Sequence, residues 1–470
     1  MLPSIAALAL ASYAAAAPAP EPASGSTIHV PVSRRAVSPR KPNGDADLEL
    51  ISSWVDHARA KYNFGASSSK RGLESRQNSN GTGIQITDVG FDSSYIGTVS
   101  IGTPAQNLEV VLDTGSSDLW VATTGCTSCP SGTTEFNTGD TSSFKSSGNS
   151  VTFQYGSGQA SGQVGTDTVS MGGFTVNGAT VTGVTSVSNN IITGPVSGIM
   201  GLGFQALSNT QSTPFWQSLL NSNQLANPEM SFYIARNAAS ITSNDQETNG
   251  GIFTLGGTNS SLFQGDIDFN NFPQGSQASY WLQTVSQLTL NGNTIDIGDS
   301  GSNTAAIDTG TTLLGGPSQA VNAFWSQVSG ARNLSNGMFA FPCDTDLSVT
   351  LSFGGKQWPI KSEDINFGSI GQGYCQGAIF DVTQGAATNQ NTPSWIVGDT
   401  FLKNVYSVFR ASPGPAVGFA ELSGSASAGT PGGSSNTNSN TGNTSGAVGR
   451  KGVSAVMMFA AAAATAAFMA

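Results

Sequence analysis

Short runs of Val, Ile, Thr and Phe follow one another along most of the chain, and Gly, Asn and Asp separate them. Such punctuated apolar runs predict β-strands joined by hairpins. Glycine occurs 58 times in 470 residues, and only 10% of residues are charged, so that Ser, Thr, Asn and Gln fill the polar positions. The pattern predicts an all-β protein with room for two or three domains.

Two of the apolar runs lead into the same turn. Residues 110–117 read VVLDTGSS and residues 305–312 read AAIDTGTT, which places Asp113 and Asp308 195 positions apart. A single Asp-Thr-Gly is ordinary turn chemistry, but two copies with matching flanks are far more specific. We infer a duplicated plan in which each half of the chain supplies one carboxylate.

A weaker echo follows each copy of the turn. Ile-Met-Gly at 199–201 and Ile-Val-Gly at 396–398 begin 86 and 88 residues after the two aspartates. The matched spacing indicates two lobes of similar plan. We expect the N-terminal lobe to span about residues 92–270 and the C-terminal lobe about residues 280–422.

The residues around each aspartate suit a paired-carboxylate site. Gly115 and Gly310 allow a tight turn and a close backbone approach, and the hydroxyls of Ser116 and Thr311 can donate to the carboxylate three residues earlier. If the turns face each other, the carboxylates lie about 3 Å apart, and two negative charges would repel by about 5 kcal/mol at an effective dielectric constant near 20. The pair would therefore share one proton and titrate as a unit.

A proton shared between two carboxylates suits one reaction well. The ionised carboxyl can act as a general base on a water molecule, while the protonated one polarises a carbonyl and then supplies its proton. This is amide hydrolysis without a covalent intermediate, and we expect neither a metal nor a cofactor. A scaffold duplication with two merely structural turns is the alternative.

Charge is unevenly distributed along the chain. Residues 1–76 hold 9 of the 18 basic and 6 of the 29 acidic residues, whereas residues 77–425 hold 7 basic and 23 acidic ones. The corresponding net charges, +3 and −16, allow the front segment to be attracted to the body. The acidic body excludes nucleic acid as an expected partner, because phosphate binding needs clustered Lys and Arg.

The four cysteines predict two disulfides in a secreted chain. We expect local pairs, Cys126 with Cys129 and Cys343 with Cys375. A redox or zinc half-site at residues 126–129 is the alternative, but no second cysteine pair of that spacing exists and the chain has only two histidines. No metal site is predicted.

The first part of the chain is typical of targeting and processing signals. Residues 1–17 are apolar, Ala-rich and end in Ala-Ala-Ala, which predicts a secretory signal peptide, with a membrane anchor as the alternative. Residues 18–76 are polar and basic and predict a propeptide that is cut at the dibasic 70–71 or after Arg76. A disordered basic linker is the alternative. The catalytic domain would then be residues 77–422.

The far end predicts attachment to a membrane. Residues 423–449 are rich in Ser, Gly, Asn and Thr and predict a flexible stalk. Residues 450–470 contain an uncharged run of 18 residues and match a GPI-anchor signal, with a transmembrane helix as the alternative. Four asparagines stand in Asn-x-Ser/Thr sequons and are expected glycan sites: Asn80, Asn259, Asn333 and Asn443.

These motifs resemble those of pepsin-family aspartic proteases over roughly residues 92–422, and the two ends resemble the GPI-anchored fungal, yapsin-type members. Residues 110–120, VVLDTGSSDLW, are close to a family signature, and residues 395–420, WIVGDTFLKNVYSVFRASPGPAVGFA, resemble the C-terminal one. The resemblance implies a bilobal all-β fold with pseudo-twofold related lobes and a central cleft. Asp113 and Asp308 would be catalytic, and the substrate would be an extended polypeptide.

The resemblance also assigns roles to other residues. Residues 155–158, YGSG, resemble the flap hairpin, so that Tyr155 would close over substrate and Trp120 would hydrogen-bond to it. Four residues would contact substrate: Gly156, Ser157, Ile199 and Thr312. The apolar residues from Ile191 to Ile199 lie where the family lines its primary pocket, which favours Leu or Phe side chains of substrate.

Residues 57–62, HARAKY, resemble the zymogen stretch that places a lysine against both aspartates, which would make the propeptide an inhibitor; a merely basic helix is the alternative. We therefore expect a monomeric, secreted, GPI-anchored acid endopeptidase of the plasma membrane or cell wall. A catalytically silent pepsin-like binding protein and a carboxylate-pair glycosidase are the alternatives. Silent relatives usually lose an Asp, a turn Gly or the flap Tyr, and all are present here.

Overall fold

We describe the protein from a computed structural model. The structure describes residues 27–35, 41, 45–62, 64, 94–155, 158–188, 191–192, 194–235, 247–299, 303–384 and 392–427. The predicted signal peptide, the predicted cleavage positions, most of the predicted stalk and the C-terminal tail lie outside these residues, as do Asn80, Gly156, Ser157 and Asn443.

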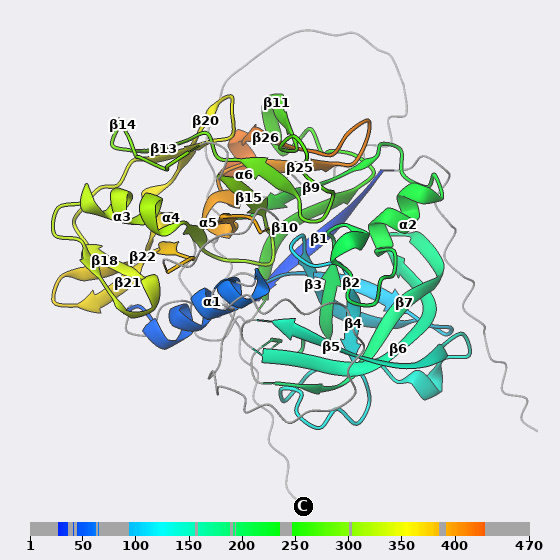
Figure 1. The fold of residues 1–470 in the computed structure, drawn as a ribbon. Coiled ribbons are helices and arrows are strands. Elements are labelled where there is room, and N and C mark those ends of the chain that lie inside the picture. The colour runs from blue at the N-terminus through cyan, green and yellow to red at the C-terminus, as the bar shows by residue number, and fades with distance from the viewer. Residues whose placement is uncertain are drawn as a thin grey trace, which may run out of the picture. The chain divides into compact units, whose positions relative to one another are not determined.

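Within these ranges the strands form four sheets (Figure 1). The largest has the order β11-β26-β25-β9-β10-β1-β2-β3-β8-β4-β7-β6-β5. Its strands are β1 (Ile28–Arg35), β2 (Ser94–Ile101), β3 (Gln106–Asp113), β4 (Leu119–Ala122), β5 (Lys145–Tyr155), β6 (Gly158–Met171), β7 (Phe174–Val187), β8 (Gly198–Gly201), β9 (Glu229–Ile234), β10 (Glu247–Leu255), β11 (Phe263–Asn271), β25 (Tyr406–Arg410) and β26 (Ala416–Leu422).

Three smaller sheets are built from residues 282–397, with the orders β12-β15-β24-β16-β23, β14-β13-β19-β20 and β17-β18-β22-β21. Their strands are β12 (Leu282–Thr284), β13 (Gln287–Leu290), β14 (Asn293–Thr294), β15 (Thr304–Ile307), β16 (Leu314–Gly316), β17 (Arg332–Asn333), β18 (Phe339–Pro342), β19 (Val349–Ser352), β20 (Gln357–Ile360), β21 (Asn366–Gly371), β22 (Tyr374–Gly377), β23 (Ile379–Asp381) and β24 (Trp395–Val397).

The described helices are short and few. They are α1 (Leu48–Lys61), α2 (Phe215–Asn221), α3 (Ser318–Ser326), α4 (Ser362–Ile365), α5 (Asp399–Leu402) and α6 (Gly424–Ser427). None of the helices in the described ranges has the length and apolar character needed to span a membrane.

The two Asp-Thr-Gly turns lie at equivalent points of two sheets. β3 ends at Asp113 and runs parallel to β8, while β15 ends just before Asp308 and runs parallel to β24. In the first sheet β4 pairs antiparallel with the echo strand β8 and parallel with β7. In the second sheet β16 pairs antiparallel with the echo strand β24 and parallel with β23. The duplicated plan, the echo strands and the all-β fold class are thereby confirmed.

Helix α1 is amphipathic and lies against the second half of the chain. Asp47 caps its N-terminus by accepting a hydrogen bond from the Leu50 amide at 3.2 Å, and basic residues occupy its last turn, where they complement the helix dipole. Its apolar face is buried against side chains of β15, β21, β23 and β24 and of the residues next to β16, β18 and β23. Trp54 packs edge-on against Phe367 at a ring separation of 5.9 Å. Figure 1 shows α1 in blue, and it also contacts β5.

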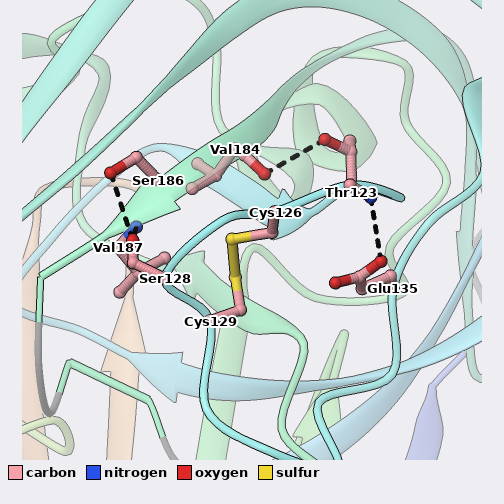
Figure 2. The surroundings of a disulfide bond; sticks show 9 residues. Thr123, Cys126, Ser128, Cys129, Glu135, Val184, Ser186 and Val187 are labelled. Carbon is pink, nitrogen blue, oxygen red and sulfur yellow. Dashed lines mark hydrogen bonds between the residues drawn. A yellow bond between two sulfur atoms is a disulfide. The ribbon is translucent and has the colours of Figure 1, made fainter.

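The structure contains both predicted disulfides, Cys126–Cys129 and Cys343–Cys375. The first closes a tight loop, in which the Ser128 hydroxyl accepts a hydrogen bond from the Val187 amide at 3.0 Å (Figure 2). Both of its cysteines pack against the apolar cluster that contains Trp120 and Ile199. The second links the end of β18 to β22. No described cysteine is a free thiol.

Candidate active site

The carboxylates of Asp113 and Asp308 meet at the side chain of Lys61. The Lys61 Nζ lies 2.7 Å from Asp113 Oδ1, and 3.0 Å and 2.9 Å from the two carboxylate oxygens of Asp308. All three side chains are buried, with exposed fractions of 5%, 4% and 0%. The two remote turns therefore face each other, and the last residue of α1 bridges them.

Each turn also holds its own carboxylate. The Gly115 amide donates to Asp113 Oδ1 at 2.9 Å, and the Ser116 hydroxyl donates to Oδ2 at 2.6 Å. The second turn repeats both bonds, from the Gly310 amide at 2.9 Å and from the Thr311 hydroxyl at 2.5 Å. Because an amide and a hydroxyl fix both oxygens, each carboxylate has one defined orientation.

The middle residues of the two turns bind the lobes together. The Thr114 amide donates to the Thr309 hydroxyl at 3.1 Å, and the Thr309 amide donates to the Thr114 hydroxyl at 2.9 Å. Each hydroxyl then donates to a carbonyl of the opposite strand, Ile307 or Leu112. Our sequence analysis gave these threonines no role, although their repetition inside the motif was a usable signal.

The charge on Lys61 sets the electrostatics of the pair. Burial raises the pKa of Asp113, even though Lys61 acts in the other direction. Burial also acts to raise the pKa of Asp308, but the Lys61 ammonium and the Thr311 hydroxyl outweigh it, and the pKa of Asp308 is lowered. Burial alone would lower the pKa of Lys61, whereas the two carboxylates raise it, so the amine stays charged at neutral pH. The carboxyls therefore differ in proton affinity.

Tyr62 adds a further bond to the site. Its hydroxyl donates to Asp308 Oδ2 at 3.0 Å, and its ring packs against Tyr280 at 4.9 Å between centroids. Both residues are outside the set that the sequence analysis assigned to the site. The sequence offered no signal for this contact beyond the position of Tyr62 next to Lys61.

Tyr155, at the end of β5, accepts a hydrogen bond from the Trp120 indole nitrogen at 2.6 Å. Trp120 lies in an apolar cluster together with Ile199, which pairs with it across β4 and β8. On its other side the Tyr155 ring stacks on His57 of α1, with ring centroids 6.2 Å apart and planes 7° from parallel. Helix α1 thus covers both the carboxylates and this tyrosine.

The remaining residues that the sequence predicted as functional are Thr312 and the sequon asparagines. Thr312 is buried, and its carbonyl accepts from the Thr400 amide and hydroxyl at 2.8 Å and 2.9 Å, which ties the turn to α5. Of the described sequon residues, Asn333 is exposed, and the Asn259 side chain accepts from the Ser261 hydroxyl at 2.7 Å.

Comparison with known proteins agrees with this geometry. The eukaryotic aspartyl protease family matches residues 94–422 of the chain. Major aspartyl peptidase 1 of Cryptococcus neoformans var. grubii is 44% identical over 362 residues, which cover 74% of this chain and 73% of that protein.

More distant relatives share the same region. An aspartic protease of Phaffia rhodozyma is 31% identical over 84% of this chain and 91% of its own length. Gastricsin of Callithrix jacchus is 34% identical over 68% of this chain and 79% of its own length. With the two carboxylates facing each other in a duplicated β-fold, the chain belongs to the eukaryotic aspartyl protease family and is an aspartic-type endopeptidase.

Proposed function

We propose that this chain is the zymogen of an acid endopeptidase, held inactive by its own propeptide. The observation that supports this is the Lys61 ammonium, which bonds to both carboxylates and occupies the place where a reacting water would have to bind. The Lys61 ammonium also acts to lower the pKa of both carboxyls, which opposes the shared proton that catalysis needs.

The two carboxyls act as general base and general acid once α1 has left. The ionised carboxyl takes a proton from water as the water oxygen bonds to the scissile carbonyl carbon, and the protonated carboxyl donates to the carbonyl oxygen. The resulting diol collapses, the carbon–nitrogen bond breaks, and the amine leaves with a proton from the pair. The sharing of one proton by such a dyad is the known behaviour of aspartic proteases.

The residues that α1 now covers would receive the substrate. The Tyr155 side chain, anchored by Trp120, would close over an extended peptide. A cluster of buried aliphatic residues adjoins it: Ile191, Ile192, Val196 and Ile199. An apolar wall of this kind favours Leu, Phe or a similar side chain next to the cleaved bond.

The ends of the chain support secretion and anchoring at the cell surface, in the manner of the yapsin-type members. A signal peptide, a polar stalk and a hydrophobic tail after residue 450 together predict a GPI anchor in the plasma membrane or cell wall. Release of the protein from intact cells by a phosphatidylinositol-specific phospholipase tests this assignment. Retention after complete digestion of other GPI proteins would contradict it.

The activity is tested with the full chain. After incubation between pH 3 and pH 7, the wild-type protein should lose residues up to about position 76 and cleave unmodified peptides. A statine-type peptide should inhibit the cleavage, and Asp113→Asn should remove it. Asp296→Asn, at an exposed carboxylate, is the matched control and should behave as wild type. Cleavage that survives Asp113→Asn would overturn the proposal.

A further inference from the structure

A second basic residue of α1, Arg59, is buried in the second lobe although it carries a charge. Its side chain is one of the few buried cations among the described residues, with the residue 8% exposed. The Arg59 Nε donates to the Val382 carbonyl at 3.2 Å, and Nη2 donates to the Asn336 carbonyl at 3.0 Å. Further bonds run to the Asp381 carbonyl and the Asn336 side-chain oxygen.

The acceptors of Arg59 are carbonyl oxygens of one lobe, spaced to receive a planar guanidinium. The Phe380 ring lies 5.8 Å from the guanidinium carbon, within the range of a cation–π contact. We call these four residues the arginine site: Asn336, Phe380, Asp381 and Val382. Lysine, with a compact and strongly hydrated ammonium, fits a fork of carbonyls less well than arginine does.

The Asp381 part of the arginine site is held by the lobe itself, whereas the Asn336 side chain also donates to the Ser52 hydroxyl and the Asp56 carboxylate of α1, at 3.0 Å and 2.9 Å. Burial lowers the pKa of Arg59, and the charges of Asp56 on α1 and then of Asp381 act against this. The Asp381 carboxylate accepts from the Ser318 hydroxyl at 2.7 Å and from the Thr383 and Gln384 amides at 3.0 Å and 2.8 Å. These partners belong to the start of α3 and to the turn after β23. Departure of the propeptide therefore removes the cation and leaves the Asp381 carboxylate held by its own lobe.

The arginine site and the catalytic turn belong to the same sheet and the same apolar cluster. β23 belongs to the five-stranded sheet in which β15 leads into Asp308. Phe380 and Val382 share one apolar cluster with Tyr62, which donates to Asp308. Along α1, Arg59 precedes Lys61 by only two residues, so the propeptide occupies the arginine site and the carboxylate pair at once.

We infer that the arginine site is a substrate subsite of the mature enzyme, which takes the guanidinium of an arginine near the cleaved bond of a peptide. This rests on the proposed endopeptidase function and deepens it. The aliphatic cluster around Ile199 and the arginine site belong to opposite lobes, so a preferred substrate combines one apolar and one arginine side chain. The propeptide then inhibits partly by offering Arg59 as that arginine.

The test uses the mature enzyme and matched peptides. In a set of peptides with the same apolar cleavage site as a reference peptide, arginine is placed at each flanking position in turn. Each arginine peptide is compared with a peptide that carries citrulline, a neutral residue of the same shape, at that position. At one position we expect arginine to raise kcat/KM about tenfold over citrulline, mainly through a lower KM. Asp381→Asn should reduce that ratio to about threefold or less.

A second variant tests the arginine site independently, and a third is a control for general effects of substitution in this lobe. Asn336→Gly removes the side-chain acceptor at a position whose φ of 61° glycine tolerates, and it should also lower the ratio. Asp346→Asn, an exposed aspartate of the same lobe, should leave the ratio unchanged. Equal cleavage of arginine and citrulline peptides at every position would overturn the subsite while leaving the endopeptidase intact. Failure to cleave any peptide, the reference included, would overturn both.

Discussion

A β-carbon placed on Gly115 would lie 2.6 Å from Oδ1 of Asp308, in the opposite lobe. Real β-carbons do not approach other atoms this closely, so the backbone of one turn packs directly against the carboxylate of the other. The reciprocal contact, between Gly310 and Asp113, is equally close-packed. The glycine of each motif is therefore a condition for bringing the two carboxylates together.

Gly115→Ala should reduce kcat/KM by at least about 100-fold, because a displacement of about 1 Å in a reacting group has this effect. The measurement is peptide cleavage by the mature enzyme. Gly414→Ala, where an added methyl group meets nothing within 4 Å, is the control and should retain activity. A Gly115→Ala enzyme as active as the control would show that the turns need not be so close.

Lys61→Met should weaken the latency of the full chain. Removing one partner of a buried ion pair costs about 3–5 kcal/mol, because the remaining charges are left unpaired, which corresponds to a loss of propeptide affinity of at least 100-fold. The expected result is self-processing at higher pH and at a faster rate, followed by gel electrophoresis. Lys41→Met, at an exposed lysine of the same segment, should process like wild type.

His57 should make the release of α1 sensitive to pH. Burial, and then the nearby Lys61, lower the pKa of His57 to about 3, while Asp308 acts in the opposite direction. In the released segment the pKa returns to about 6.5. As pH falls below about 6.5, the released segment binds a proton that the bound segment cannot, so the stabilisation by docked α1 is complete above pH 6.5 and is lost progressively toward pH 3.

His57→Phe keeps a ring against Tyr155 but cannot be protonated. The pH at which half of the chain is processed in a fixed time should therefore move to lower values than in the wild type. Protonation of carboxylates at low pH also promotes release, because it weakens the attraction between the +3 segment and the −16 body. The effect of His57 should add to this one. An unchanged pH midpoint would show that His57 does not contribute to release.

The two disulfides should contribute unequally to stability. In the chain-entropy model, the Cys343–Cys375 loop, with a sequence separation of 32, stabilises by about 4 kcal/mol, and the Cys126–Cys129 loop, with a separation of 3, by about 2 kcal/mol. Replacing each pair by serines should lower the free energy of unfolding in that order, measured by denaturant titration. A larger loss for the shorter loop would point to packing against Trp120 as its main role.

The sequence predicted the carboxylate pair because the motif is repeated, and the repetition is visible without a structure. It predicted the strand-rich class from the apolar runs in the same way. The bond between Tyr155 and Trp120 came from family resemblance, since nothing in their spacing requires contact. The site of Arg59 could not be predicted, because its acceptors are backbone carbonyls brought in from positions 277 to 323 residues away.

Strand β1 was also missed, since a short segment with two arginines carries little strand signal of its own. Its pairing is supplied by β10 along its whole length and by β2 at its end. The predicted cleavage positions follow both β1 and α1 in the chain. Severing the chain there does not by itself detach a strand that is hydrogen-bonded on both sides in the interior of the sheet. We therefore expect cleavage and activation to be separate events, so that a cleaved protein remains inactive until β1 has left the sheet.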